Sequence, residues 1–465
     1  MTEGTPELER TLVDHLSQAR FEDLPAASVE AARCCVLDAV AVCVAGSTGK
    51  DIQKLLQWLE AQGGPGEAGA LVYGTRLPAH HASWINSAMA RAHEFDDSHD
   101  PTGDHTSVPI FSAALAAAEL RGGVSGREFL TAYVLAADLV SRLRLAPTRK
   151  VGGTDFAANT YAPFAAATAA GWLLGLRDDG LYAALGWASA QAAGSLQLQQ
   201  GGTSTLHVHH GLAAATGVQG AMLARQGLPG MEHFLTGPFG FYQAYERGDY
   251  AADVITYELG QRFEIEQVSI KQYPSGRVTH GPIQAAIALR ETHGLRSEDV
   301  EEVVVTYTMG GYRMTCLPEV ERRAPTNVQH AKFSLFYTVA CALARGHVDL
   351  GDFTSSALAD EVVQRLASRV RVEVDPNLGR VIPPGIVRVR LRDGRELSMR
   401  VEHLRGTPED PVRFADCVAK LRLCAGHAAR PLAADRVEAV VELVALLEQQ
   451  DDVGPLAGLL AAGTV

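Results

Sequence analysis

The chain has 465 residues, a formal net charge of −13 and 47% hydrophobic residues. Single hydrophobic cores usually stop growing at about 250–300 residues, so we expect at least two domains. The acidic balance and the lack of a Lys/Arg-rich block argue against a nucleic-acid partner, because phosphate binding requires clustered cations. A few converging cations in a cleft can still bind a small anion.

The N-terminal segment is charged and amphipathic. It has neither the apolar stretch of a signal peptide nor the Arg- and Ser-rich composition of a transit peptide, so we expect a cytoplasmic protein. The seven cysteines are scattered without a C-x-x-C pair, which is typical of buried thiols in a reducing compartment. The most apolar run, which begins at Phe164, is shorter than the roughly 20 residues of a membrane span, so it predicts a buried helix and no membrane partner.

The hydrophobic pattern changes twice along the chain. Apolar residues recur at helical spacing in Ala-rich segments over residues 1–265, and the same pattern returns over residues 406–465. Between them, residues 266–405 contain runs that alternate apolar and polar side chains, and Asp393-Gly394 is typical of a type I′ hairpin turn. We therefore predict a mainly α fold, in which a large all-helical domain is built from both chain ends and a smaller α+β domain is inserted.

A first polar cluster interrupts the helical pattern in the stretch RAHEFDDSHDPTGDHTSVP. It contains Glu94, Asp96, Asp97, Ser98, His99, Asp104 and His105. We expect Asp97 and Ser98 at the end of a helix, because Pro101 and Gly103 prevent its continuation, and His105 shortly before the next helix. The spacing matches neither an H-E-x-x-H helix nor an EF-hand loop. A metal site, a network of caps and turns, and an acid/base site remain open interpretations.

A second cluster lies in IKQYPSGRVTHGPIQAAIALRE. Lys271, Arg277 and His280 are predicted to come together over a Pro-Ser-Gly turn, directly before a helix whose first N–H groups can bind an anion. This pattern favours a carboxylate-binding pocket, although Lys271 could equally be a solvated strand residue. A third cluster, with His207, His209 and His210, precedes another Ala-rich helix, and a metal site or a helix cap would each explain it.

The order of these clusters resembles the MmgE/PrpD family, whose members include dehydratases, decarboxylases and epimerases of small organic acids. The resemblance spans nearly the whole chain. It rests on the segments NSAMARAHEFDDSH with His105 downstream, GTSTLHVHHGLAAATGVQGAMLA, KQYPSGRVTHGPIQAA, PTNVQHAKFSLFYTVACAL and DGRELSMRVEHLRGTPEDPV. Five motifs in the family's order are far more specific than any one of them.

The resemblance implies a helical domain built from both chain ends, an inserted α+β lid, a cofactor-free active site between them and a homodimer. Glu94 and Ser98 stand where the family has an active-site Asp and Thr, while Asp97, His105 and Lys271 match its polar positions. The departures from the family pattern are Phe156 and Leu206, which stand where its dehydratases and decarboxylases usually have a histidine and a lysine.

These residues predict removal of a proton next to a carboxylate of a small acid. This step needs a base near neutral pKa and fixed positive charge, which His105 and Lys271 could supply, with Asp97 orienting the imidazole. The predicted catalytic set is His105, Lys271, Asp97, Ser98 and Glu94, and the predicted substrate-binding set is Asp96, Arg277, His280, His207 and His209. We expect a lyase, either dehydratase or decarboxylase, without cofactor or metal. An isomerase or epimerase of the same family, or a non-catalytic binding protein, are the alternatives.

Overall fold

The computed structural model describes residues 7–148, 156, 158–200, 202–379 and 382–461. The structure is 58% helical with few strands, which confirms the prediction of a mainly α fold. Contacts divide the described chain into two compact units. The first unit comprises the residues up to Ala92, Asp96–Val268 and those from Arg413 onward, and the second comprises His93–Phe95 and Ser269–Val412.

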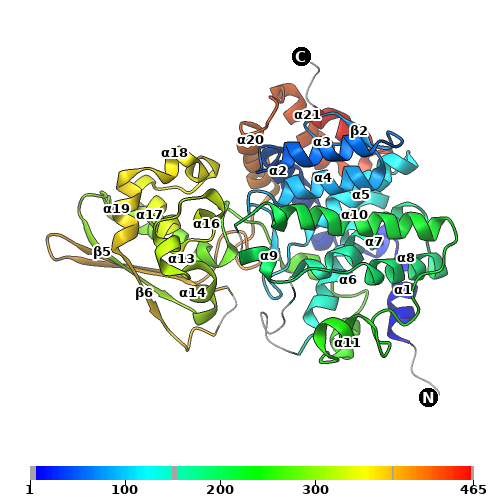
Figure 1. The fold of residues 1–465 in the computed structure, drawn as a ribbon, viewed down its shortest axis with the longest axis horizontal. Coiled ribbons are helices and arrows are strands. Elements are labelled where there is room, and N and C mark those ends of the chain that lie inside the picture. Colours follow the sequence, from blue (N-terminus) through cyan, green and yellow to red (C-terminus); the bar gives the residue numbers. More distant parts are fainter. Residues whose placement is uncertain (1–6, 149–155, 157, 201, 380–381, 462–465) are drawn as a thin grey trace. The chain divides into compact units, whose positions relative to one another are not determined.

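The first unit is a bundle of helices, drawn in blue to green and in red in Figure 1. Its α-helices are α1 (Leu8–Gln18), α2 (Ala26–Gly46), α3 (Ile52–Gln62), α4 (Ala79–Arg91), α5 (Ser107–Arg121), α6 (Gly126–Leu145), α7 (Ala162–Leu173), α8 (Asp178–Ala190), α9 (Gln197–Gln200), α10 (Thr205–Arg225), α11 (Phe241–Glu246), α12 (Ala252–Thr256), α20 (Phe414–Ala425), α21 (Ala434–Ala445) and α22 (Pro455–Leu460). Its short strands are β1 (Ala68–Gly69), which pairs with β2 (Arg76–Leu77), and β3 (Ser98–His99). Strand β4 (Val268–Ser269) stands at the boundary of the units.

Small residues allow these helices to pack closely. Helix α10 lies against α4, α7 and α8 (Figure 1). A Cβ atom at Gly211 of α10 would overlap the carbonyl oxygen of Trp84 on α4, and a Cβ at Gly46 of α2 would overlap that of Met89. Only glycine fits at these contacts, because any side chain would push the helices apart. The glycines therefore set the distance of α2 and α10 from α4, whose last residue, Arg91, enters the candidate site.

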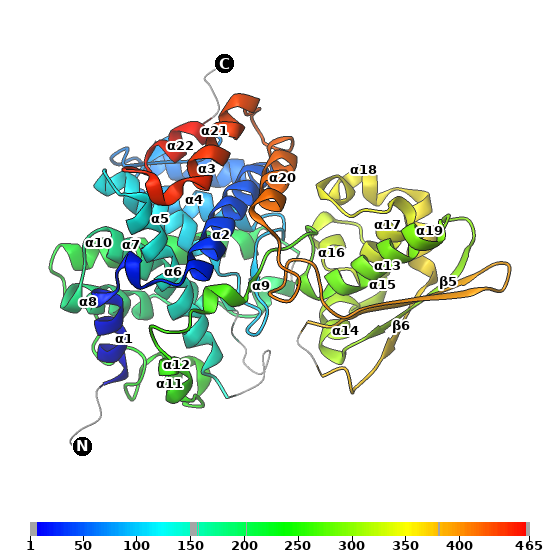
Figure 2. The same cartoon turned by 180° about the vertical axis from the view of Figure 1, so that it is seen from behind.

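The C-terminal helices return to the first helices of the same unit. Figure 2 shows α20 and α21 beside α2, with α22 packed against α21. Lys420 of α20 forms a buried ion pair of 2.6 Å with Asp38 of α2. Removing one partner of a buried pair would leave an uncompensated charge, at a cost of about 3–5 kcal/mol. This pair holds α20 on α2 although the two helices are far apart in the sequence.

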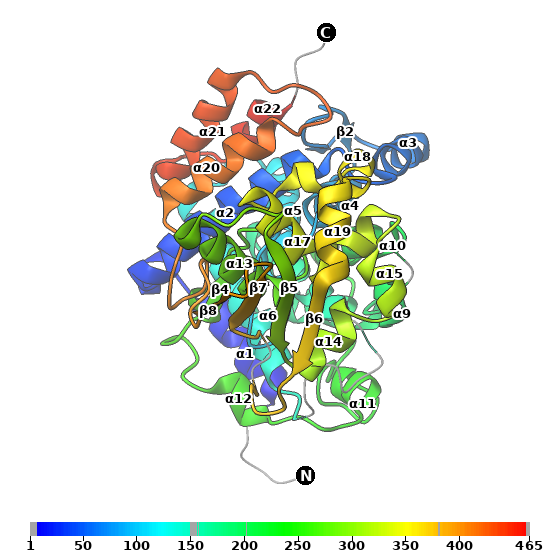
Figure 3. The same ribbon diagram turned by 90° about the vertical axis from the view of Figure 1, so that its left-hand side faces the viewer.

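The second unit combines a four-stranded sheet with helices, as Figure 3 shows. Its helices are α13 (His280–His293), α14 (Met309–Thr315), α15 (Glu319–Arg323), α16 (Val328–Lys332), α17 (Leu335–Arg345), α18 (Ser355–Leu358) and α19 (Glu361–Arg369). Its strands are β5 (Val300–Tyr307), β6 (Val370–Val374), β7 (Gly385–Leu391) and β8 (Glu396–Val401), in the order β6-β5-β7-β8. Only β5 and β6 run parallel. Valines of these strands form one apolar core with residues of α13, α17 and α19.

The hairpin predicted at Asp393-Gly394 is present, but its turn differs from the prediction. The antiparallel strands β7 and β8 flank it, and the Leu391 amide donates to the carbonyl of Arg395 at 2.8 Å. The loop therefore has three residues, and Gly394 has a φ of +89° whereas Asp393 is not among the described residues with positive φ. A type I′ turn needs positive φ at both central positions. The alternating pattern predicted the two strands correctly, but it did not show that the loop between them has three residues instead of two.

Further sequence predictions have clear outcomes. All seven cysteines are free and buried, and the apolar run from Phe164 lies in α7, every residue of which is buried, so both predictions are confirmed. Among the described residues, no helix combines the length and apolarity needed to cross a membrane. The expected helix end at Asp97 and Ser98 is wrong, because α4 ends at Arg91. Glu94 has a φ of +55°, and this left-handed conformation cannot continue a right-handed helix.

Candidate active site

The residues predicted from the sequence fall into both units. In the first unit lie Asp96, Asp97, Ser98, His105, His207 and His209; in the second lie Glu94, Lys271, Arg277 and His280. The loop between α4 and α5 supplies members of both groups, because His93–Phe95 cluster with the second unit and the residues from Asp96 onward with the first.

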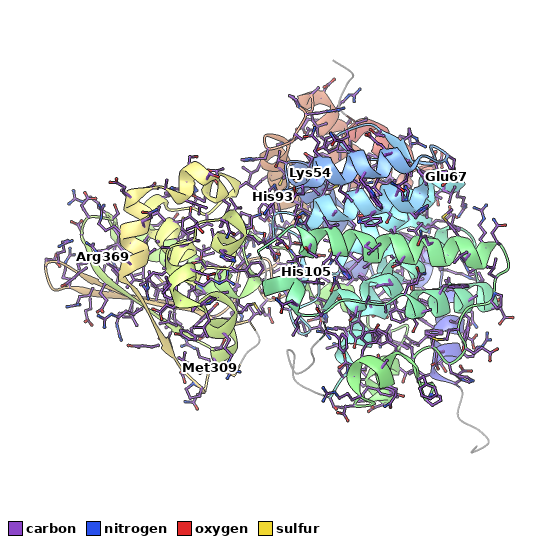
Figure 4. All side chains as sticks on the ribbon, in the orientation of Figure 1. Lys54, Glu67, His93, His105, Met309 and Arg369 are labelled. Atoms are coloured by element: carbon purple, nitrogen blue, oxygen red, sulfur yellow. The ribbon has the colours of Figure 1, made fainter. Side chains whose placement is uncertain are left out.

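His105, labelled in Figure 4, is held from both ring nitrogens. Its Nδ1 lies 2.7 Å from Oδ2 of Asp96, and its Nε2 lies 3.1 Å from Nη2 of Arg91. A guanidinium can only donate, so Nε2 accepts and Nδ1 carries the proton that is donated to Asp96. We assign this tautomer from the hydrogen-bond network. The imidazole is thus neutral, with its basic lone pair on Nε2.

The residues of this hydrogen-bonded group, His105, Asp96 and Arg91, differ in their exposure to solvent. The side chain of Asp96 is 1% exposed, and that of Arg91 is also buried, whereas His105 is 16% exposed. Nη1 of Arg91 lies 3.5 Å from Oδ1 of Asp96, so the carboxylate has a cation beside it as well as the imidazole. A buried carboxylate with such partners stabilises an imidazolium if His105 takes up a proton. The arrangement can therefore support general base chemistry at Nε2 of His105.

Asp97 does not orient His105, which corrects the sequence interpretation. Its carboxylate accepts hydrogen bonds from the backbone amide of Ser107 at 3.1 Å and from the Ser107 hydroxyl. It therefore fixes the start of α5. Burial raises the pKa of Asp97 to about 7, and the hydrogen bonds from Ser107 oppose this rise. The path of the loop, not the residue type, decides which of two adjacent aspartates faces the imidazole.

The rest of the loop is engaged in its own contacts. His99 of β3 places Nδ1 2.8 Å from the Thr102 hydroxyl and Nε2 3.2 Å from Oε2 of Glu264. Asp104 accepts from the backbone amide of His105 at 3.0 Å, and burial raises the pKa of Asp104. Ser98 is buried in β3. These contacts stabilise the loop that presents His105.

The three histidines of α10 have different surroundings. His207 places Nε2 2.9 Å from the carbonyl oxygen of Lys50, and Nδ1 of His209 contacts the Asn159 side chain. His210 is 3% exposed, and its ring stands perpendicular to that of His105 with 5.7 Å between the centroids. The sequence interpretation assigned no role to His210 or Arg91. Their signals were the last histidine of the H-x-H-H run and an arginine at the edge of the first cluster.

Lys271 is the central cation of the second group. Its side chain is fully buried, and Nζ donates to the carbonyl oxygen of Glu94 at 3.1 Å and lies 3.5 Å from Oε2 of Glu94. The interpretation of Lys271 as a solvated strand residue is therefore wrong. The left-handed conformation of Glu94 costs of order 1–3 kcal/mol, and such strain persists only where other contacts fix the residue. The two contacts from Lys271 provide such a restraint.

The turn after Lys271 carries the other two residues predicted for the carboxylate-binding pocket. Nη1 of Arg277 lies 3.3 Å from Nδ1 of His280, and both side chains are buried. His280 begins α13, and Arg277 stands in the 3-10 turn before it. The Gly276 amide donates to the carbonyl of Lys332 at 2.9 Å, and Nζ of Lys332 lies 3.1 Å from Nδ1 of His93. The predicted meeting of Arg277 and His280 is observed, while Lys271 contacts Glu94.

A metal-ligand arrangement is found elsewhere in the second unit. Within the part of the chain that the structure describes, the one group of three ligand-type side chains close enough to share an ion is His347, Asp349 and Asp352. Asp349 and Asp352 form the capping box of the 3-10 helix Leu350–Phe353, and Asp352 pairs with Arg345. These contacts explain the acidic residues without a ligand.

The two positions that depart from the family pattern carry apolar side chains. The Phe156 ring packs edge-on against Tyr245, with centroids 4.8 Å apart. Leu206 is buried in the first turn of α10. Neither side chain can donate a proton or hold a carboxylate.

Comparison with known proteins identifies the family. The MmgE/PrpD N-terminal domain matches residues 10–253, and the MmgE/PrpD C-terminal domain matches residues 273–446. The chain belongs to the MmgE/PrpD family. This confirms the resemblance seen in the sequence motifs.

Several relatives of known name are similar over most of their length. A cis-aconitate decarboxylase of Aspergillus terreus is 28% identical over 472 residues, which cover 96% of this chain and 94% of the relative. The cis-aconitate decarboxylase of Homo sapiens is 26% identical over 409 residues, with 83% and 80% covered. A cis-aconitate decarboxylase-like protein of Aspergillus oryzae is 25% identical over 494 residues, with 99% of both chains covered. The MmgE/PrpD member described here is accordingly an enzyme, and at the level of the family the relatives support a lyase.

Proposed function

We propose that the protein is a cofactor-independent lyase that removes a proton from the carbon next to a carboxylate of a small organic acid. The observation that carries this proposal is the hydrogen-bonded arrangement of His105, which fixes a neutral imidazole with its lone pair on Nε2. Family membership and the relatives named as cis-aconitate decarboxylases support the lyase class. We propose that the substrate is a small carboxylic acid similar to cis-aconitate.

His105 is the proposed base. When Nε2 takes the proton, the resulting imidazolium lies beside the buried carboxylate of Asp96, which stabilises the positive charge. Nε2 accepts a hydrogen bond from Arg91, so the substrate must replace that donor before proton transfer. A carboxylate of the substrate is the natural partner for the guanidinium that is released, because it can accept two parallel hydrogen bonds.

Lys271 is the proposed stabiliser of the negative charge that develops on the substrate oxygen. A fixed ammonium group in a buried position stabilises an enolate-like oxygen more strongly than water does. Glu94, which contacts Lys271, and Asp96, which contacts His105, are separated in the chain by Phe95 alone. This closeness in the sequence supports the proposal that base and cation act on the same acid.

The remaining predicted residues keep their proposed roles. Arg277 and His280, at the N-terminus of α13, would bind a second carboxylate of the substrate through their side chains. His207 and His209 are proposed substrate contacts, and Ser98 is a proposed member of the catalytic set through the family resemblance, whereas Asp97 is proposed to hold the start of α5. The homodimer that the resemblance implies is likewise a proposal, which sedimentation equilibrium of the purified chain would test.

A second candidate is an isomerase or epimerase that uses the same proton removal. Loss of a β-hydroxyl gives dehydration, loss of CO₂ with protonation gives decarboxylation, and return of the proton to the other face gives epimerisation. The apolar side chains of Phe156 and Leu206 favour this candidate, because fewer groups remain to protonate a leaving hydroxyl or to hold several carboxylates.

Proton exchange in D₂O tests the proposal. Purified protein is incubated with cis-aconitate, citrate-like acids and amino diacids, and the products are followed by NMR. We expect deuterium incorporation with loss of CO₂ or water for a lyase, and incorporation without such loss for an epimerase. His105→Gln and Lys271→Met should each lower the rate by about 10²- to 10⁴-fold.

Exposed positions provide matched controls for these variants. Lys54, which is labelled in Figure 4, is 81% exposed on α3, and His293 is exposed at the end of α13. Lys54→Met and His293→Gln should keep the wild-type rate. Binding of an acid without any exchange would show a non-catalytic binding protein and overturn the proposal.

A further inference from the structure

His210 is a buried imidazole that the proposed reaction leaves without a role. It lies in the second turn of α10, where Leu206, Ala213 and Ala214, at helical neighbour positions on the same side, are all buried. Among the described residues, Nδ1 of His210 has no hydrogen-bond partner. A buried nitrogen without a partner costs about 1–3 kcal/mol, so this feature of the apolar helix face requires an explanation.

The surroundings of His210 connect it to the proposed base. Its ring stands edge to face with that of His105, and Arg91, Asp96 and His209 are the other titratable groups that act on it. Burial, reinforced by the positive charge of Arg91, lowers the pKa of His210 well below the ordinary value. The imidazole is therefore neutral at physiological pH, and it stays neutral when His105 becomes a cation.

The position of His210 depends on the packing of the bundle. Gly211, its neighbour in the chain, lies against the backbone of Trp84 on α4, the helix that ends with Arg91. The hydrogen bond from the Trp84 indole to the carbonyl of Val208, at 3.0 Å, fixes the same turn of α10. These two contacts place the imidazole beside His105 and restrict its movement.

We propose that His210 is a further catalytic residue, an uncharged imidazole whose N–H donates a hydrogen bond to the substrate oxygen that becomes negative. This inference rests on the proposed function. His105 takes the proton from carbon, the electron pair of the broken C–H bond moves toward the oxygen, and His210 shares its N–H without giving up the proton. A neutral imidazole suits this task, because it polarises the oxygen without a proton having to be moved.

Two substitutions separate this role from simple packing. His210→Phe keeps an aromatic ring against His105 but removes the N–H, whereas His210→Gln keeps an N–H donor and loses the ring. If His210 donates to the substrate, His210→Phe should lower kcat by about 10²- to 10³-fold with little change in KM, and His210→Gln should retain more of it. If the ring only packs against His105, the order of the two variants is reversed and the inference is wrong. Thermal unfolding of both variants shows whether each has folded.

A binding measurement keeps this inference separate from the proposed function. In protein labelled with ¹⁵N in its histidine rings, cis-aconitate should shift the ring signals of His210, identified by their absence in His210→Phe. A shift without turnover would support the contact and overturn the lyase proposal. Turnover with neither a shift nor an effect of His210→Phe would overturn the role of His210 and leave the lyase proposal standing. Neither turnover nor a shift would overturn both.

Discussion

Substitution of Asp96 by asparagine tests the central contact of the candidate site. The amide oxygen can still accept the proton of His105 Nδ1, but the amide nitrogen then faces Arg91, so two donors oppose each other. If the side-chain amide of the asparagine rotates by about 180°, its NH₂ group faces Nδ1 of His105. The imidazole then favours the tautomer that carries its proton on Nε2, which cannot act as the base. In either orientation the carboxylate that stabilises the imidazolium is lost.

The size of the effect follows from these contacts. A hydrogen bond to a charged group contributes about 1.5–3 kcal/mol, which corresponds to roughly 10- to 150-fold in rate. Loss of the productive tautomer lowers turnover by up to about 10⁴-fold where an aspartate orients a catalytic histidine. We therefore expect Asp96→Asn to lower kcat/KM by about 10²- to 10⁴-fold. Because Arg91 also loses a buried counterion, unfolding should require about 3 kcal/mol less free energy.

The assay is the initial rate of deuterium incorporation or product formation with the most active acid, combined with urea denaturation. The matched control is Asp179→Asn, because Asp179 is 90% exposed and forms a surface ion pair with Arg10. Asp97→Asn provides a contrast. If Asp96 orients His105, the fall in kcat/KM caused by Asp97→Asn should be at least tenfold smaller than the fall caused by Asp96→Asn. A folded Asp96→Asn protein with a rate within threefold of wild type would refute this account of the site.

The remaining predictions concern the framework around the site. Gly211→Ala places a Cβ on the carbonyl of Trp84, so α10 should move away from α4. We expect the free energy of unfolding, measured with urea, to fall by about 1–3 kcal/mol and the activity to fall with it. Unchanged values of both would contradict the close contact between Gly211 and Trp84. Asp97 has a folded-state pKa of about 7, above the ordinary aspartate pKa of 3.8, so the folded state binds the proton more tightly. Its contribution to stability is complete below about pH 4 and is lost as the pH rises through 7. Between pH 5 and pH 8 the free energy of unfolding should therefore fall by about 3 kcal/mol because of Asp97. Asp97→Asn should remove most of this pH dependence in urea titrations. An unchanged pH dependence would refute the raised pKa of Asp97.

Regular periodicity and ordered motifs carried most of the sequence prediction. Helical spacing of Ala and Leu predicted the mainly α fold, and alternation predicted β7 and β8, because burial of one face repeats along each element. The motifs around His105 and Lys271 predicted the family, since they occur in a fixed order over the whole chain. The periodicity is a property of each short segment, and the order of the motifs is a property of the sequence. Both can therefore be recognised without knowledge of the tertiary contacts.

Contacts between distant residues were decided by the tertiary structure alone. The sequence offers two adjacent aspartates, but the left-handed Glu94 and the path of the following loop turn Asp96, not Asp97, toward His105. The burial of Lys271 against Glu94, and the approach of His210 to His105, depend on segments more than a hundred residues apart. A sequence determines which chemical groups are available and how each segment repeats, whereas only the packed chain selects which groups face one another, because that choice depends on loop paths and helix separations set by contacts such as that of Gly211 with Trp84.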